Sequence, residues 1–158
     1  MRINFSYDKK LVIQALRYHF ISRPEIKVLL VLVNVFAIVA AVLLYMHKVS
    51  PLAFLLSSVL WITLMIVFWI ILPRIIYKRA STFKEIFTMM FSEKNIRIEN
   101  ERGYNEWKWS QFSTFIESPH FFHLYFNSRS FFLVPKAAVE QDGNTGELRK
   151  MLQKNIKR

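Results

Sequence analysis

The sequence has no cysteine and only three glycines among its 158 residues. Without cysteine the chain can form no disulfide bond and no thiolate site. Three scattered glycines cannot build the glycine-rich loop that cradles phosphate groups. No G-x-S-x-G context frames a serine nucleophile either. These absences remove the common catalytic signatures and leave the distribution of apolar and charged residues as the main signal.

Charge is missing from two long stretches, residues 28–47 and 49–73, which are separated only by Lys48. A transmembrane helix needs about 20 mainly apolar residues to cross a hydrocarbon core of roughly 30 Å. Both stretches meet this length, and the short loop makes the two helices antiparallel neighbours. The sequence therefore predicts a two-span transmembrane hairpin over residues 22–84. Its last part is a cytoplasmic stalk, with a kink expected at Pro73.

Local signals mark where each predicted span begins. Ser22 and Glu25 have capping-box spacing, and Pro24 stands in the first turn, where its missing N–H does no harm. Ser50 and Pro51 mark the start of the second span in the same way.

Most of the net charge of +11 lies beside the hairpin. Residues 1–27 hold six basic and two acidic groups, residues 74–84 hold four basic groups and no acid, and residues 85–158 are nearly balanced. Short flanks rich in Lys and Arg stay in the cytoplasm, so both termini are expected to be cytoplasmic. This distribution argues against a nucleic-acid partner, which would require a basic patch on the folded domain.

Arg74, Lys78 and Arg79 follow the second apolar stretch directly. We expect these cations to contact anionic lipid headgroups, which attract each basic residue near the surface by about 1 kcal/mol. The alternative is that they only set the orientation of the hairpin during insertion.

Residues 1–21 predict a short strand followed by a basic amphipathic helix. Ile3, Phe5 and Tyr7 alternate along the strand, and the periodicity changes to that of a helix from Asp8 onward. The apolar helical face is formed by Leu11, Val12, Ala15, Leu16, His19 and Phe20. This face either lies in the headgroup layer or packs on the C-terminal domain, and the sequence leaves both readings open.

Residues 85–158 are expected to fold as one small cytoplasmic domain. Short aromatic strands are predicted at residues 86–92, 95–99, 104–109, 113–117, 121–127 and 130–134. Residues 100–103 form a hairpin turn with Gly103 at positive φ, and residues 145–157 form a final helix with an apolar stripe. Antiparallel strands closed by a helix indicate an α+β domain or a partial barrel.

Asn34 is the only strongly polar side chain inside the first span. It shares a helical face with Ala37 and Ala41. Small residues at this spacing permit close contact between helices. Asn34 and Thr63 lie about 9 and 13 Å from the cytoplasmic end, so a hydrogen bond between them is predicted. A pump or relay normally needs an ionisable residue in the membrane, and none is present. We therefore interpret all four residues as helix-packing positions.

His120 and His123 have H-x-x-H spacing, but residues three apart on a strand point to opposite faces. No Asp or Cys nearby completes a ligand set, so neither a metal nor a cofactor is predicted. The many aromatic residues around Trp107 and Trp109 are interpreted as a domain core, with a ligand pocket or protein-docking surface as the alternative.

Three segments resemble the YcxB-like family of bacterial membrane proteins: residues 5–8 leading to 15–19, residues 109–117, and residues 131–136. The order of strand, helix, two spans, β domain and helix also agrees. One departure follows Lys136, where residues 137–139 replace an aromatic position of the family. The resemblance implies a bacterial inner-membrane location and a β domain shaped like a pleckstrin-homology (PH) domain. It implies no activity.

The sequence thus predicts a membrane α+β protein without enzymatic activity. Its PH-like domain is expected to bind lipid headgroups or a protein partner at the cytoplasmic face, as a regulator or a membrane immunity protein. Association with further copies of the chain is left open. The alternative is a small membrane enzyme acting on lipid, which would need polar catalytic groups at headgroup depth.

Overall fold

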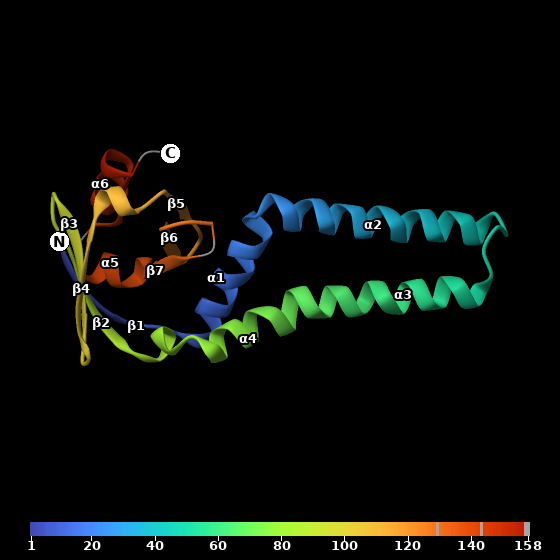
Figure 1. Ribbon diagram of the computed structural model, residues 1–158, viewed down its shortest axis with the longest axis horizontal. Helices are drawn as coiled ribbons and strands as arrows, with labels where there is room; N and C mark the ends of the chain where they lie inside the picture. The colour runs from blue at the N-terminus through green and yellow to red at the C-terminus, as the bar shows by residue number, and fades with distance from the viewer. Residues whose placement is uncertain (129, 143, 157–158) are drawn as a thin grey trace. The chain divides into compact units, whose positions relative to one another are not determined.

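The computed structural model describes residues 1–128, 130–142 and 144–156, and the chain forms two compact units. The first unit comprises Met1–Ala15 and Ala80–Arg158, and the second comprises Leu16–Arg79. The N-terminal strand therefore belongs to the same unit as the C-terminal strands and not to a separate N-terminal segment. Helix α1 (Lys9–Ser22) contributes residues to both units (Figure 1).

The second unit is a helical hairpin. Helices α2 (Pro24–Tyr45) and α3 (Pro51–Ile66) run antiparallel beside each other (Figure 1). Helix α3 continues into the π-helix η1 (Val67–Ile71) and then into α4 (Leu72–Arg79). The helices Pro24–Tyr45 and Pro51–Arg79 have mean hydropathies of 2.9 and 2.6 and are long and apolar enough to cross a membrane. No residue of α2 or α3 is buried, unlike the core helices of soluble proteins.

The loop between the two helices begins with a tight helix end. His47 has a φ of 55°, and its N–H donates to Leu44 O while the N–H of Lys48 donates to Leu43 O. This is a Schellman motif, which satisfies the last carbonyls of α2. Ser50 then caps α3 as predicted, because its hydroxyl accepts a hydrogen bond from Ala53 N at 3.3 Å.

The predicted capping box at the start of the first span is wrong. Ser22 is the last residue of α1, and its hydroxyl donates to Tyr18 O at 2.7 Å. Arg23 is the N-cap of α2 and makes no side-chain capping bond. The reason is that α1 continues almost to the first residue of α2, so Ser22 is already committed to the preceding helix.

The first unit contains two antiparallel sheets. The first sheet has the order β1-β2-β3-β4, formed by β1 (Arg2–Ser6), β2 (Ile86–Phe91), β3 (Asn95–Asn100) and β4 (Gly103–Lys108). The second has the order β5-β6-β7, formed by β5 (Thr114–Glu117), β6 (Phe121–Tyr125) and β7 (Phe131–Pro135). Two 3₁₀ turns, η2 (Ser81–Lys84) and η3 (Trp109–Gln111), and two helices, α5 (Lys136–Asp142) and α6 (Thr145–Asn155), complete the unit.

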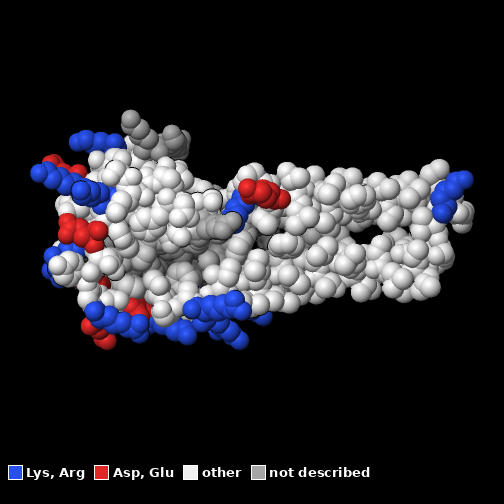
Figure 2. All heavy atoms as spheres, in the orientation of Figure 1, with Lys and Arg blue, Asp and Glu red and all other residues white. Residues whose placement is uncertain are grey.

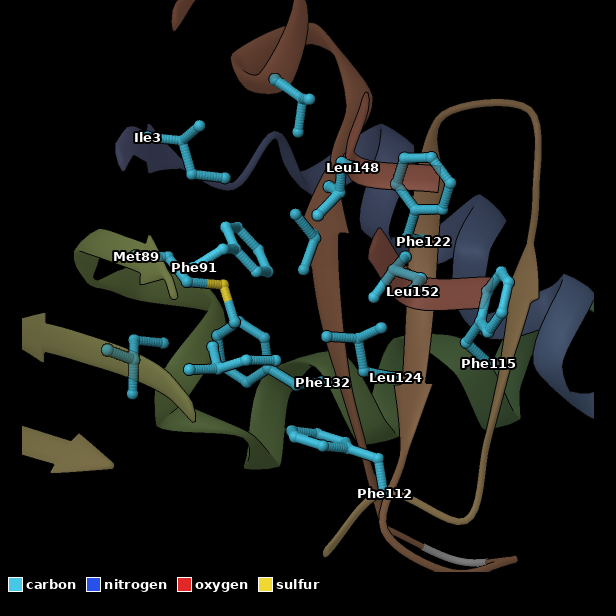
Figure 3. Packing of buried hydrophobic residues seen from close by; sticks show 14 of the residues in the cluster. Ile3, Met89, Phe91, Phe112, Phe115, Phe122, Leu124, Phe132, Leu148 and Leu152 are labelled. Carbon is cyan, nitrogen blue, oxygen red and sulfur yellow. The ribbon is translucent and has the colours of Figure 1, made fainter. Parts of the chain in front are cut away.

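Aromatic and aliphatic side chains from both sheets and both helices form one core (Figure 3). Phe87 of β2 lies between the sheets, with ring centroids 6.0 Å from Phe5 and 5.8 Å from Phe132. Leu148 and Leu152 of α6 are fully buried in the same cluster. Burial of this kind, at roughly 25 cal/mol per Å² of apolar surface, supplies the main stabilisation of a small domain.

The predicted strands are all present, with ends that differ by one or two residues, and Gly103 has the expected positive φ of 141°. Two details differ. Trp109 begins the 3₁₀ turn η3 and does not end a strand, and its indole Nε1 donates to Ser92 O at 3.1 Å. Helix α5 was not predicted; its short apolar segment buries Ala138 and Val139.

Candidate membrane-surface site

Three basic side chains gather on α4 at the end of the second apolar helix. Arg74, Lys78 and Arg79 are all exposed, and α4 contains no acidic residue. Within the described part of the chain, none of the three pairs with a carboxylate. Figure 2 shows basic groups collected along α4, whereas basic and acidic groups alternate over the β domain. The collar formed by these three residues is therefore an uncompensated positive surface.

The backbone just before this collar is locally rearranged. Pro73 has no N–H, so the carbonyl of Trp69, four residues earlier, cannot receive its usual helical hydrogen bond. The Nε of Arg17 on α1 donates to this carbonyl at 2.8 Å. The preceding turn widens into the π-helix, in which the N–H of Leu72 reaches Val67 O. Arg17 thus compensates for Pro73 and joins α1 to the second apolar helix.

The sequence did not single out Arg17, which falls largely on the basic face of the predicted amphipathic helix. A signal was nevertheless present. A proline inside an apolar helix leaves a carbonyl that needs another donor, and a nearby arginine can supply it. The kink predicted at Pro73 takes the form of the π-helix Val67–Ile71.

The contact between α2 and α3 uses other residues than those predicted. Half-buried positions on α2 recur every three or four residues at Leu30, Val33, Ala37, Ala40 and Leu44. Among the predicted packing residues, only Ala37 belongs to this stripe, while Asn34, Ala41 and Thr63 are exposed. Asn34 was predicted to face α3, but it lies about 100° around the helix from Val33, which does belong to the half-buried stripe.

The predicted hydrogen bond between Asn34 and Thr63 is not formed. The Asn34 side chain donates from Nδ2 to Leu30 O at 2.7 Å, and the Thr63 hydroxyl donates to Val59 O at 2.8 Å. Each side chain therefore bonds to the preceding turn of its own helix, as short polar side chains commonly do in apolar helices.

The apolar face of α1 is buried inside the protein. Val12, Ala15, Leu16 and His19 are all less than 5 % exposed. Burial lowers the pKa of His19 to about 4, and the charge of Arg23 lowers it further in the same direction. His19 is therefore neutral near pH 7. Of the two readings of this helix, packing within the protein is favoured over a position flat in the headgroup layer.

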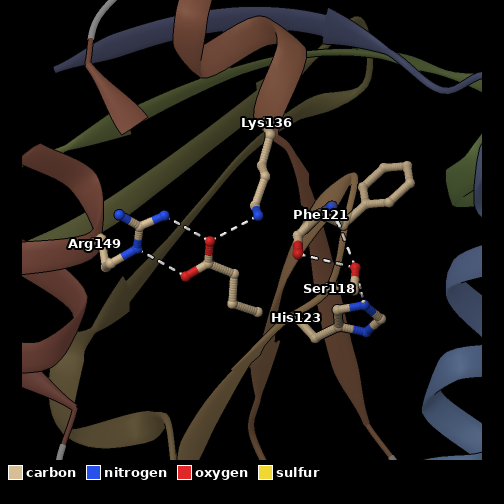
Figure 4. A network of polar contacts seen from close by, with 6 residues as sticks. Ser118, Phe121, His123, Lys136 and Arg149 are labelled. Atoms are coloured by element: carbon tan, nitrogen blue, oxygen red, sulfur yellow. Dashed lines mark hydrogen bonds and ion pairs between the residues drawn. The ribbon is translucent and has the colours of Figure 1, made fainter. Parts of the chain in front are cut away.

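Ser118 and His123 form a buried pair that is not arranged for catalysis (Figure 4). The Ser118 hydroxyl donates to Phe121 O at 3.0 Å, and His123 Nε2 lies 3.0 Å from Ser118 Oγ. Because the single hydroxyl proton is already used, the imidazole donates to the serine instead of accepting from it. His120 is exposed, on the turn before β6. Among the described residues, no cluster of three His, Cys, Asp or Glu is placed to hold a metal.

A second polar cluster joins three elements of the β domain (Figure 4). The Glu117 carboxylate accepts hydrogen bonds from Arg149 Nε and Nη2 at 2.8 and 2.7 Å, and Lys136 Nζ lies 2.7 Å from Glu117 Oε1. The hydrogen bonds from Arg149 lower the pKa of Glu117 to about 2. With every charge paired, this cluster fastens α5 and α6 to β5 and leaves no free acid or base.

The aromatic set is core, which was the favoured interpretation of the sequence. Trp109 is 6 % exposed, and Phe112, Phe115, Phe121 and Phe122 are buried. Trp107 is partly buried and packs against Phe112 and Phe126, with ring centroids at 6.1 and 5.0 Å. These rings fill the space between the sheets.

A comparison with family models finds one match, and it lies within the β domain. No curated protein and no solved structure matches the chain. One family model, described as YcxB-like protein, matches residues 91–152, from the end of β2 into α6. Two of the three segments that carry the resemblance, residues 109–117 and 131–136, lie inside this match. Over residues 91–152 the chain thus matches the YcxB-like protein family, as its sequence predicts.

Proposed function

We propose that this chain is a non-enzymatic protein of the bacterial cytoplasmic (inner) membrane that binds anionic lipid headgroups through its collar of Arg74, Lys78 and Arg79. The observation that carries the proposal is that three exposed cations without an acidic partner directly follow a helix long and apolar enough to span a bilayer. At about 1 kcal/mol per cation, the collar would contribute roughly 3 kcal/mol in an anionic membrane at low salt.

Strand pairing supports placing both flanks of the hairpin on the same side of the membrane. Strand β1 precedes both apolar helices and β2 follows them, yet the two strands pair in register, with Phe5 opposite Phe87. Such pairing requires an even number of crossings. The excess of Lys and Arg on these flanks then favours the cytoplasm for both termini. The two antiparallel sheets with a C-terminal helix are compatible with the PH-like fold that the family resemblance implies.

The test is reconstitution of the full-length protein in vesicles of zwitterionic lipid, with and without phosphatidylglycerol. The triple variant Arg74→Gln, Lys78→Gln, Arg79→Gln should lose most of the stabilisation that phosphatidylglycerol gives the parent. A matched variant removes three exposed cations of the β domain instead, at Lys94, Lys150 and Lys154. It should retain that stabilisation.

Salt gives a second readout, because screening at about 0.15 M shortens electrostatic range to roughly 8 Å. The parent's stabilisation by phosphatidylglycerol should therefore fall as salt is added. If the collar variant responds to phosphatidylglycerol as the parent does, the collar acts only as an orientation signal during insertion.

A protein partner at the cytoplasmic face is a second proposal, favoured by strand β4. This strand is at the edge of its sheet, and all its residues except Trp107 are exposed, including Tyr104 at 62 %. An edge strand can be extended by an incoming strand. A regulator or membrane immunity protein would use such an edge. The N–H of Lys108 donates away from β3, so by strand alternation the N–H of Glu106 also faces the open edge. Glu106→Pro should then abolish binding of a purified partner without removing a hydrogen bond between β3 and β4.

The alternative of a lipid-modifying enzyme has no observation in its favour. The collar supplies cations without an acid, and the Ser118–His123 pair is enclosed in the β domain with its hydroxyl proton already donated.

A further inference from the structure

Asn34 occupies an exceptional place in the first apolar helix. It lies ten residues after Pro24 and eleven before Tyr45, so it is about 15 Å from either end of α2. The charge-free part of this helix begins only at Val28, after Glu25 and Lys27, so Asn34 lies about 9 Å inside a hydrocarbon core of roughly 30 Å. Asn34 is exposed on α2, so when the helix spans a bilayer its side chain faces lipid tails and not the partner helix α3.

The carboxamide of Asn34 has more hydrogen-bonding capacity than its own helix uses. Its two N–H groups and its carbonyl oxygen offer two donors and an acceptor. One N–H donates to Leu30 O at 2.7 Å. The second N–H and Oδ1 have no partner among the residues that the structure describes. The hydroxyls of Ser57, Ser58 and Thr63 differ, because each has one proton and donates it to a backbone carbonyl.

The surroundings at this depth offer few partners. Water is scarce inside the hydrocarbon core, and the ester carbonyls of lipids lie at its boundary, about 9 Å from Asn34. The Trp61 indole N–H of α3 also has no partner among the described residues, but this atom is enclosed and cannot reach an outward-facing side chain. A partner for Asn34 must therefore come from another membrane-spanning segment.

We propose that Asn34 joins two copies of this chain, each donating its free N–H to the Oδ1 of the other. A second copy inserted in the same orientation necessarily has an Asn34 at the same depth, and a carboxamide is complementary to itself. Ala41 supports the contact, because it is exposed seven residues further along and so lies on the same face of α2. Its small side chain lets two α2 helices approach closely.

The test measures self-association of the full-length protein in vesicles by energy transfer between labelled copies. Asn34→Leu keeps the side-chain size and should raise the dissociation constant about tenfold, as expected for the loss of two interhelical hydrogen bonds. Asn34→Gln retains the carboxamide and should keep association near the parent's. Thr63→Val is the matched control, since it removes a polar group at similar depth from the other apolar helix, and it should have no effect.

Cross-linking gives an independent readout, because the chain has no cysteine of its own. Ala41→Cys should form a disulfide-linked dimer in membranes, and adding Asn34→Leu should suppress it. Val39→Cys, at an exposed position about 160° from Ala41 around the helix, should not cross-link. Equal association of the parent and Asn34→Leu, or equal cross-linking at positions 39 and 41, overturns the proposal.

Discussion

Glu117 joins three elements of the β domain, and replacing it by glutamine tests how much stability depends on this junction. Its carboxylate on β5 binds Arg149 of α6 through two hydrogen bonds and pairs with Lys136 at the start of α5. Glu117→Gln keeps the shape of the side chain but removes its charge. Lys136, whose side chain is only 17 % exposed, would then lack its counter-charge. The variant should therefore be less stable at pH 7.

The magnitude follows from the pKa of Glu117. Hydrogen bonds from Arg149 are the largest cause that lowers this pKa from 4.5 to about 2, and the hydrogen bond and charge of Lys136 also lower it while burial opposes them. At 1.36 kcal/mol per pKa unit the full difference would be about 3.4 kcal/mol. The side chains of Glu117 and Arg149 are 28 % and 43 % exposed, so water screens the interaction. We therefore expect a loss of about 1–2 kcal/mol.

The effect should depend on pH in a defined direction. Because the folded state lowers the pKa of Glu117, its stabilisation is fully present above about pH 4.5 and is lost as the pH falls through about 2. Glutamine does not titrate. The difference in free energy of unfolding between the parent and Glu117→Gln should therefore shrink over this interval and be nearly gone at its acid end.

The assay is thermal unfolding of the full-length protein in detergent, followed by near-ultraviolet circular dichroism of the buried aromatic rings. Each kcal/mol lost from the free energy of unfolding should lower the Tm of a unit this size by about 4–8 °C. Glu140→Gln is the control, since it removes an exposed carboxylate of α5. A loss that is equal at pH 7 and about pH 2, or that Glu140→Gln reproduces, would refute the assignment.

Three further predictions concern the core, the apolar helix and the topology. Trp109→Ala should cost about 3–5 kcal/mol and make the β domain sensitive to protease, whereas Tyr104→Ala, at an exposed position, should not. Arg17→Met should speed amide hydrogen exchange around Trp69, and this effect should be smaller in a Pro73→Ala background, where residue 73 gains an N–H for the Trp69 carbonyl. Reporter fusions at both termini should report the cytoplasm, and a periplasmic signal from either end would contradict the topology.

The strands and the hairpin could be predicted because their signals are local and repeated. Two long charge-free stretches identify the apolar helices, and short runs of aromatic residues bounded by turns identify the strands. Helix α5 was not predicted because seven residues are too few to display helical periodicity. Pro135 beside it indicated only the end of a strand.

The contacts between distant residues were harder to predict. The predicted bond between Asn34 and Thr63 was argued from their depth along the helices, but depth says nothing about rotation around each helix, and each side chain bonds to its own helix. The Ser22 capping box failed for a related reason, since the sequence could not show that α1 would extend as far as Ser22. The contact of Arg17 could not be predicted either. Pro73 leaves the Trp69 carbonyl without its helical donor, and the donor that replaces it comes from another helix.

The pairing of β1 with β2 also constrains how the protein is made. Asn4 and Thr88 are 84 positions apart in the chain, yet their side chains hydrogen-bond across the two strands. Ile3 and Phe5 of β1 are buried in the core of the domain. The β domain therefore cannot complete its core until both apolar helices and β2 have been synthesised. Under the proposed two-span topology, correct insertion of the hairpin is a condition for folding, because a chain with one helix left uninserted would separate β1 from the edge of β2 and leave that edge unpaired.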